Sequence, residues 1–159
     1  MAALVVSAAG CGTGGVGVTR FDDAHVVVRT GVEGIRGRQT VVAEFWPTED
    51  HLHLYGMELP DGGIDGAGRP TRLVVDDPNW RSVGDPTASV ASQLVTLAGF
   101  DAPFAIYPDG PVTLRQDVEP VVAGAAPGAV GVKVTFMACS SAGVCYVPVE
   151  GVSLLVPAD

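Results

Sequence analysis

Residues 132–149 read VKVTFMACSSAGVCYVPV, and this stretch carries the clearest pattern for the fold. Valine, threonine and phenylalanine favour strands, and the side chains of a strand alternate between its two faces. The apolar side chains at the even positions of 132–136 would therefore share one face, and Cys139 would lie on the more polar face with Lys133. Small residues follow Cys139, so the pattern predicts a tight connection into a second strand.

Short apolar runs of the same kind, separated by glycine, proline and aspartate, recur along the chain. Their spacing is typical of a β-sandwich, and nothing alternates with long helices as a parallel α/β sheet requires. Only residues 88–99 predict a short helix or helical turn. We expect an all-β, antiparallel sandwich in a single domain, since 159 residues suffice for one full core. The predicted strands are residues 25–29, 40–46, 72–75, 103–106, 112–114, 130–137, 146–149 and 152–156.

The overall composition excludes some classes of protein. The net charge is −9 and no lysine or arginine cluster is present, which disfavours nucleic-acid binding because a phosphate backbone requires a basic surface. Hydrophobic residues make up 47% of the chain, which argues against disorder. No apolar run approaches the roughly 20 residues of a membrane-spanning helix.

The N-terminal residues 2–11 read AALVVSAAGC, an apolar run that ends in small residues before a cysteine. This pattern is typical of a bacterial lipoprotein signal, in which the cysteine, here Cys11, is lipidated. Residues 1–22 would then be a signal remnant and flexible tether, and residues 23–159 the folded domain. A buried strand with an inert cysteine is one alternative. A dinucleotide-binding glycine motif is another, but it requires a following helix, whereas strand-like sequence follows here.

A long polar connection, residues 59–70, reads LPDGGIDGAGRP. Loops of this length on a sheet scaffold are often functional. Its two aspartates lack the spacing and the closing glutamate of a calcium-binding loop. The composition therefore predicts a mobile loop.

The chain contains three cysteines, an odd number that predicts one pair plus one cysteine with a separate role. Cys139 and Cys145 would face each other across the hairpin, at a Cα separation that permits a disulfide. Such a bridge closes a very short loop, so its entropic stabilisation is small. Exposed short bridges are often the labile ones, but static disulfides are common in exported domains. Spacing alone leaves both open, and a single cysteine pair lacks the ligands of a zinc site.

Three segments resemble the N-terminal periplasmic domain of the thiol–disulfide interchange protein DsbD. The most specific is residues 136–148, FMACSSAGVCYVP, in which a strand ends in cysteine, five mostly small residues follow, and a second cysteine precedes tyrosine. Residues 53–60, HLYGMELP, are similar to the tyrosine-bearing strand and turn of that family, and residues 105–114 are similar to the stretch before its cysteine hairpin. The resemblance covers residues 24–157.

The resemblance implies an immunoglobulin-like sandwich whose cysteine pair exchanges electrons without a cofactor. It implies that Cys145 forms the mixed disulfide with a partner and that Cys139 resolves it. Tyr55 and Tyr146 would pack beside the pair, and Val144 would precede the second cysteine. The family shields its pair with a loop that carries an aromatic residue, and the matching region here is the glycine-rich 59–70 loop.

The resemblance also implies the partners and location. Electrons would come from a thioredoxin-like or membrane thiol–disulfide relay protein and pass to exported disulfide-bearing proteins. The domain would be extracytoplasmic and held at the outer face of the cytoplasmic membrane through a lipid anchor on Cys11. No C-x-x-C motif occurs in the sequence, which predicts an electron-exchange module that needs partners and is not a complete reductase.

Two alternatives remain at this level. His51 and His53 would share a strand face near Met57, and with Met137 and the cysteines they offer the soft ligands that suit copper(I). The other alternative is a non-catalytic assembly module with a structural disulfide.

Overall fold

Strands and loops, with no helix, make up residues 17–35 and 37–158, which the computed structural model describes. The strands are β1 (Thr19–Asp23), β2 (Val26–Ile35), β3 (Arg38–Pro47), β4 (Leu52–Leu54), β5 (Arg72–Val75), β6 (Trp80–Ala88), β7 (Gln93–Val95), β8 (Phe104–Ile106), β9 (Val112–Pro120), β10 (Ala129–Phe136), β11 (Ala138–Ser140) and β12 (Val149–Pro157). The predicted all-β fold class is confirmed.

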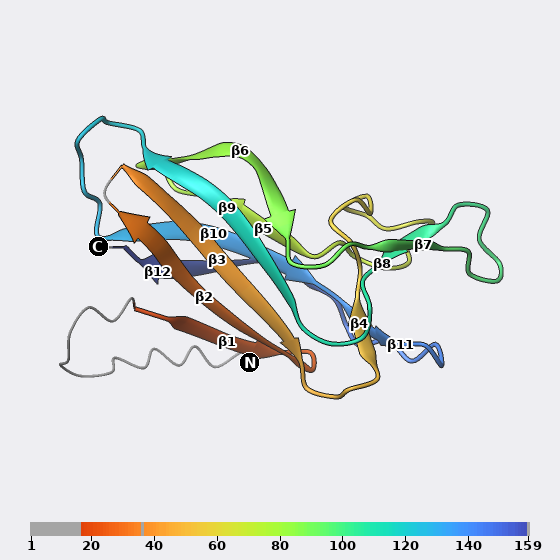
Figure 1. The fold of residues 1–159 in the computed structure, drawn as a ribbon. Helices are drawn as coiled ribbons and strands as arrows, with labels where there is room; N and C mark the ends of the chain where they lie inside the picture. Colours follow the sequence, from red (N-terminus) through yellow and green to blue (C-terminus); the bar gives the residue numbers. More distant parts are fainter. Residues whose placement is uncertain (1–16, 36, 159) are drawn as a thin grey trace.

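Two antiparallel sheets form the body of the molecule. The larger has the order β1-β2-β3-β9-β6, and the smaller, β12-β10-β5, lies behind it (Figure 1). Every strand pair within these sheets is antiparallel. The arrangement is consistent with the predicted single β-sandwich, while its immunoglobulin-like connectivity stays a prediction.

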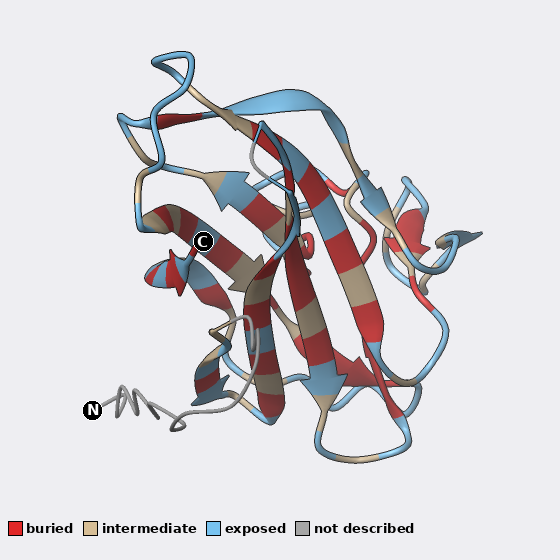
Figure 2. Ribbon diagram, turned by 60° about the vertical axis from the view of Figure 1, so that its left-hand side comes forward, coloured by how far each residue is buried: buried red, intermediate tan, exposed pale blue. Residues whose placement is uncertain are grey.

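The core follows from alternation of apolar and polar side chains. Along β2 every second residue from Val26 to Val32 is buried, and along β10 the same holds from Val130 to Phe136. Figure 2 shows this as bands of buried residues across the strands. The two layers meet where the Phe45 ring of β3 packs edge-on against the Phe136 ring of β10, with centroids 5.9 Å apart.

Two small two-stranded sheets lie together at one end of the sandwich (Figure 1). One pairs β4 with β11 and the other pairs β7 with β8. Tyr55, directly after β4, joins them because it forms a bridge with Ile106 of β8 and another with Pro70. This end of the molecule carries the cysteine pair.

The predicted helix at residues 88–99 is wrong. β6 continues to Ala88, and Gln93–Val95 forms β7. The Ser89 amide donates to the Thr113 carbonyl at 2.8 Å, and β7 pairs with β8. Tertiary strand pairing therefore satisfies the backbone that a helix would have satisfied internally.

Two other predicted segments also differ from the structure. β1 begins at Thr19, inside the segment 1–22 that the sequence assigns to a signal remnant and tether, and its Phe21 is buried in the core. The predicted strand at residues 146–149 is not formed, since β12 begins only at Val149.

The proposed lipidation site, Cys11, lies outside the described residues. In the described ranges we find no helix that could span a membrane.

Candidate redox site

A disulfide joins Cys139 and Cys145, with Cα atoms 4.1 Å apart. Cys139 belongs to β11, and Cys145 forms an isolated antiparallel bridge with it. The Ser140 amide donates to the Val144 carbonyl at 2.8 Å, and the Tyr146 amide donates to the Ala138 carbonyl at 3.0 Å. These bonds close the predicted tight turn and hold the two cysteines opposite each other.

The two cysteines differ sharply in exposure. Cys139 is 2% exposed, whereas Cys145 is exposed. The prediction that Cys139 lies on a polar face is therefore wrong. β10 ends at Phe136 after a register shift, and Cys139 belongs to a different sheet. Strand parity counted from Val132 does not carry across this break.

Tyr55 contacts the buried cysteine directly. Its hydroxyl donates a hydrogen bond of 3.3 Å to the Cys139 Sγ. Thr71 holds the tyrosine in place because its amide and its hydroxyl both donate to the Tyr55 carbonyl, at 3.1 and 2.7 Å. Burial raises the pKa of the Tyr55 phenol, so the hydroxyl stays a proton donor. The structure thus brings Tyr55 to the pair, as expected for this residue.

An aromatic shield covers the buried side of the site. Phe104 is 0% exposed and packs with Tyr55, Leu59 and Cys139 in a small core separate from the main one. The Phe104 ring lies 5.9 Å from that of Tyr55 and 5.0 Å from that of Phe100. The shielding rings, Phe104 and Phe100, therefore come from β8 and the loop before it. The sequence did not identify either ring as part of the site, although it predicted a strand at residues 103–106.

The loop 59–70 also packs against the site. It places Leu59 in the small core, with Ile64 and Ala67 against it. Gly68 has a φ of +75°, and a Cβ there would lie 3.3 Å from the Tyr55 ring. A larger residue at this position would conflict with both the left-handed backbone and the tyrosine.

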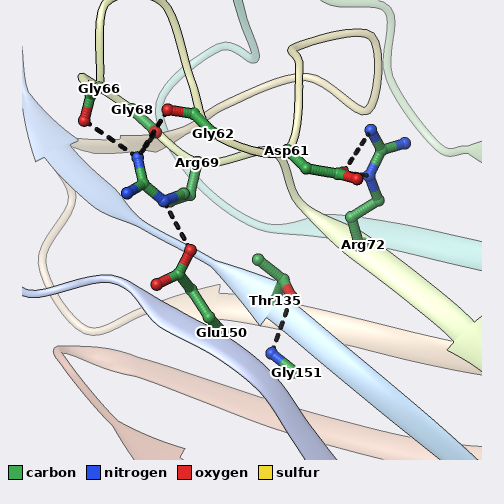
Figure 3. A network of polar contacts seen from close by, with 9 residues as sticks. All are labelled: Asp61, Gly62, Gly66, Gly68, Arg69, Arg72, Thr135, Glu150 and Gly151. Atoms are coloured by element: carbon green, nitrogen blue, oxygen red, sulfur yellow. Dashed lines mark hydrogen bonds and ion pairs between the residues drawn. The ribbon is translucent and has the colours of Figure 1, made fainter.

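Two arginines fasten this loop (Figure 3). Arg69 donates to the carbonyls of Gly62, Gly66 and Gly68 and to the Glu150 carboxylate at 2.6 Å. Arg72 donates to Asp61 at 3.1 Å and to the Leu59 carbonyl at 3.2 Å. These hydrogen bonds tie the loop to the rest of the fold, which the prediction of a mobile loop did not anticipate.

His53 lies on the same small sheet as the buried cysteine. It is the register partner of Cys139 in the antiparallel pair of β4 and β11. It is 8% exposed, and its Nδ1 lies 3.6 Å from the Asp109 Oδ1. Burial lowers the pKa of His53, and Asp109 offsets part of this effect.

Tyr146 follows Cys145 and lies in a second polar group, at the surface. Its hydroxyl donates to Glu49 at 3.1 Å, and its ring stacks on His25 with centroids 3.8 Å apart. Glu49 also lies 3.2 Å from the His25 Nδ1 and 3.3 Å from the His51 Nε2. Partial burial and the hydrogen bond to Glu49 raise the pKa of the Tyr146 phenol. The Tyr146 side chain is thus held by Glu49 and His25, and its hydroxyl is directed to Glu49 and not to the sulfurs.

Val144, the residue before Cys145, is 58% exposed, and Val147 is 79% exposed. The Val144 amide donates to the Ser140 hydroxyl at 3.3 Å, so the Val144 backbone stabilises the turn while its side chain stays at the surface. Exposed apolar side chains therefore lie on both sides of Cys145.

The residues of the copper alternative do not converge. His51 pairs with Glu49 and His53 with Asp109. Met57 packs against the main core, and Met137 against the small core. Among the described residues, no group of three or more histidine, cysteine, aspartate or glutamate side chains is placed to hold a metal ion.

Comparison with models of known protein families and with curated proteins found no match.

The lowered pKa of His53 predicts an acid-dependent loss of stability. Unfolded histidine takes up a proton below about pH 6.5, but the buried imidazole takes one up only at lower pH. Protons thus favour the unfolded chain, and the free energy of unfolding should fall as the pH drops from about 6.5 through the pKa of folded His53. Urea denaturation of the oxidised protein between pH 8 and pH 5 measures this. The fall should be smaller in His53→Gln and unchanged in His51→Gln, and an equal fall in all three proteins would contradict it.

Proposed function

We propose that this protein is an extracytoplasmic thiol–disulfide exchange module that passes electrons through the Cys139–Cys145 pair. The observation that carries the proposal is the unequal environment of the two sulfurs. Cys145 is exposed at a turn, while Cys139 is buried and accepts a hydrogen bond from Tyr55. A disulfide of this kind has one sulfur open to attack and one sulfur prepared to leave.

The exchange follows from this asymmetry. A partner thiolate attacks the Cys145 Sγ, a mixed disulfide forms, and the electron pair of the broken bond leaves on the Cys139 Sγ. The Tyr55 hydroxyl then donates to a sulfur that has gained negative charge, which strengthens the hydrogen bond. In the opposite direction, Cys145 as a thiolate attacks a substrate disulfide and Cys139 resolves the product. The assignment of Cys145 as the attacking cysteine agrees with the roles that the resemblance implies.

The partners in this proposal are proteins. A thioredoxin-like or membrane relay protein supplies electrons, and exported disulfide-bearing proteins receive them. The exposed Val144 and Val147 beside Cys145 support contact with a protein surface. The presence of a disulfide also favours an oxidising compartment outside the cytoplasm, and Cys11 is our proposed lipid anchor at the membrane.

The reduction potential distinguishes exchange from a structural role. We expect the pair, in a Cys11→Ser background, to equilibrate with dithiol redox buffers above about −300 mV, the level below which structural disulfides lie. A thioredoxin-type protein without its resolving cysteine should form a mixed disulfide that peptide mapping locates at Cys145. The double variant Cys139→Ser/Cys145→Ser is the control and should capture nothing. A potential far below −300 mV together with no mixed disulfide would assign the pair a structural role.

A further inference from the structure

His53 shares one face of the small sheet with the buried cysteine. Because His53 and Cys139 are directly opposite in an antiparallel pair, their side chains point to the same face with Cβ atoms about 4.5–5.5 Å apart. Tyr55 lies two residues after His53, directly beyond the end of β4, and its hydroxyl reaches the Cys139 Sγ at 3.3 Å. The His53 and Tyr55 rings meet edge to face, with centroids 5.8 Å apart. The His53 imidazole is thus directed to the same face of the small sheet as the Cys139 side chain.

The charged group that acts on His53 comes from a third element. Asp109 follows β8, and its Oδ1 lies 3.6 Å from the His53 Nδ1. The groups around His53 are therefore Tyr55 just after its own strand, Cys139 on β11, and Asp109 in the segment after β8. With Nδ1 directed at the carboxylate, Nε2 is the nitrogen available to accept a proton. A nucleophile, a base and a third group that orients the base is the arrangement that activates a cysteine.

A buried resolving cysteine needs such a base. Burial in apolar surroundings disfavours the thiolate, and only the thiolate attacks a disulfide. Cys139 lies in the small core with Phe104 and Leu59, and among the described residues its sulfur accepts a hydrogen bond from Tyr55 alone. Without a proton acceptor nearby, the reduced Cys139 would remain a thiol and would resolve a mixed disulfide slowly.

We propose that His53, oriented by Asp109, removes the proton from reduced Cys139 and forms an imidazolium–thiolate pair with it. The proposal rests on the function proposed above and assigns the residue that controls its resolving step. In that step the Cys139 thiolate attacks the Cys145 Sγ of a mixed disulfide. The Cys139–Cys145 bond forms, the bond to the substrate sulfur breaks, and its electron pair leaves on that sulfur, which takes a proton from water. The pair is oxidised by two electrons, the substrate is reduced, and His53 returns its proton to water once Cys139 carries no charge.

The titration of Cys139 tests the proposal directly. In a Cys11→Ser/Cys145→Ser protein, Cys139 is the one thiol, and its ionisation is followed by thiolate absorbance near 240 nm. We expect half-ionisation at least about one pH unit below the ordinary cysteine value of about 8.5, a tenfold effect. His53→Gln should reverse this shift. His51→Gln, which removes a histidine paired with Glu49 instead, should leave it unchanged.

Two further measurements keep the test informative if His53→Gln does not fold. Asp109→Asn keeps the imidazole and should raise the pH of half-ionisation of Cys139, as His53→Gln does, but by less. In the unaltered protein, NMR titration of the His53 ring should give a higher pKa in the reduced than in the oxidised state, because only the reduced state places a negative charge beside it. Equal Cys139 titrations with and without His53, or one His53 pKa in both redox states, would overturn the proposal.

The rate of resolution separates this proposal from the function on which it rests. If His53 activates Cys139, the His53→Gln protein should accumulate the mixed disulfide at Cys145 and resolve it at least about tenfold more slowly. A pair that exchanges normally in His53→Gln would remove the role of His53 and leave the proposed function intact. A pair that no partner reduces in any variant would remove the proposed function.

Discussion

A variant that retains only Cys145 should react with a maleimide reagent about a hundredfold faster than a variant that retains only Cys139. The exposed Cys145 meets the reagent in the folded state, but Cys139 is 2% exposed and requires the small core to open first. An opening free energy of about 3 kcal/mol lies within the range known for local opening, and it reduces the reactive population about a hundredfold.

The comparison requires two proteins, Cys11→Ser/Cys139→Ser and Cys11→Ser/Cys145→Ser, with reaction followed by mass spectrometry at one pH. In urea above the unfolding transition both thiols are exposed, so their rates should converge, which serves as the internal control. Equal rates in the folded state would show that either sulfur is open to attack, and the assignment of Cys145 as the exchanging cysteine would lose its basis.

The sandwich itself was predictable because its signal is local. Alternation along β2 and β10 determines which side chains are buried, and the predicted runs at 40–46, 72–75 and 130–137 lie within a few residues of β3, β5 and β10. β6 was missed because its residues are nearly all exposed, so no alternation marks it. Pairing with β9 creates that strand, and pairing partners distant in sequence leave no local pattern.

The site shows the same limit more strongly. The cysteine spacing was sufficient to predict the pairing of Cys139 and Cys145, and the resemblance was sufficient to place Tyr55 near them. Burial of Cys139 was not predictable, because the chain changes sheets between Phe136 and Ala138 and the count of alternating faces restarts. The sequence suggests His53 only as a metal ligand, since Asp109 approaches it from a segment more than fifty residues away.

The shielding aromatic Phe104 provides the second large effect. Phe104→Ala should lower the free energy of unfolding by about 3–5 kcal/mol, the usual loss for a fully buried phenylalanine. Because Phe104 packs in the small core with Cys139 and Tyr55, we expect the cavity to weaken this core in particular. In the Cys11→Ser/Cys145→Ser background, the reaction of Cys139 with maleimide should therefore accelerate toward the rate of an exposed thiol.

Phe45→Ala is the matched control, since Phe45 is equally buried but lies in the main core against Phe136. It should cost a similar free energy of unfolding in a urea titration. Its effect on Cys139 should be much smaller under native conditions, because the thiol is exposed through opening of the small core and the main core need not unfold for that. If both variants accelerate the reaction equally, the small core opens only together with the whole sandwich. A selective effect of Phe104→Ala would mean that the aromatic shield controls access to Cys139 and that the small core opens while the rest of the sandwich stays folded.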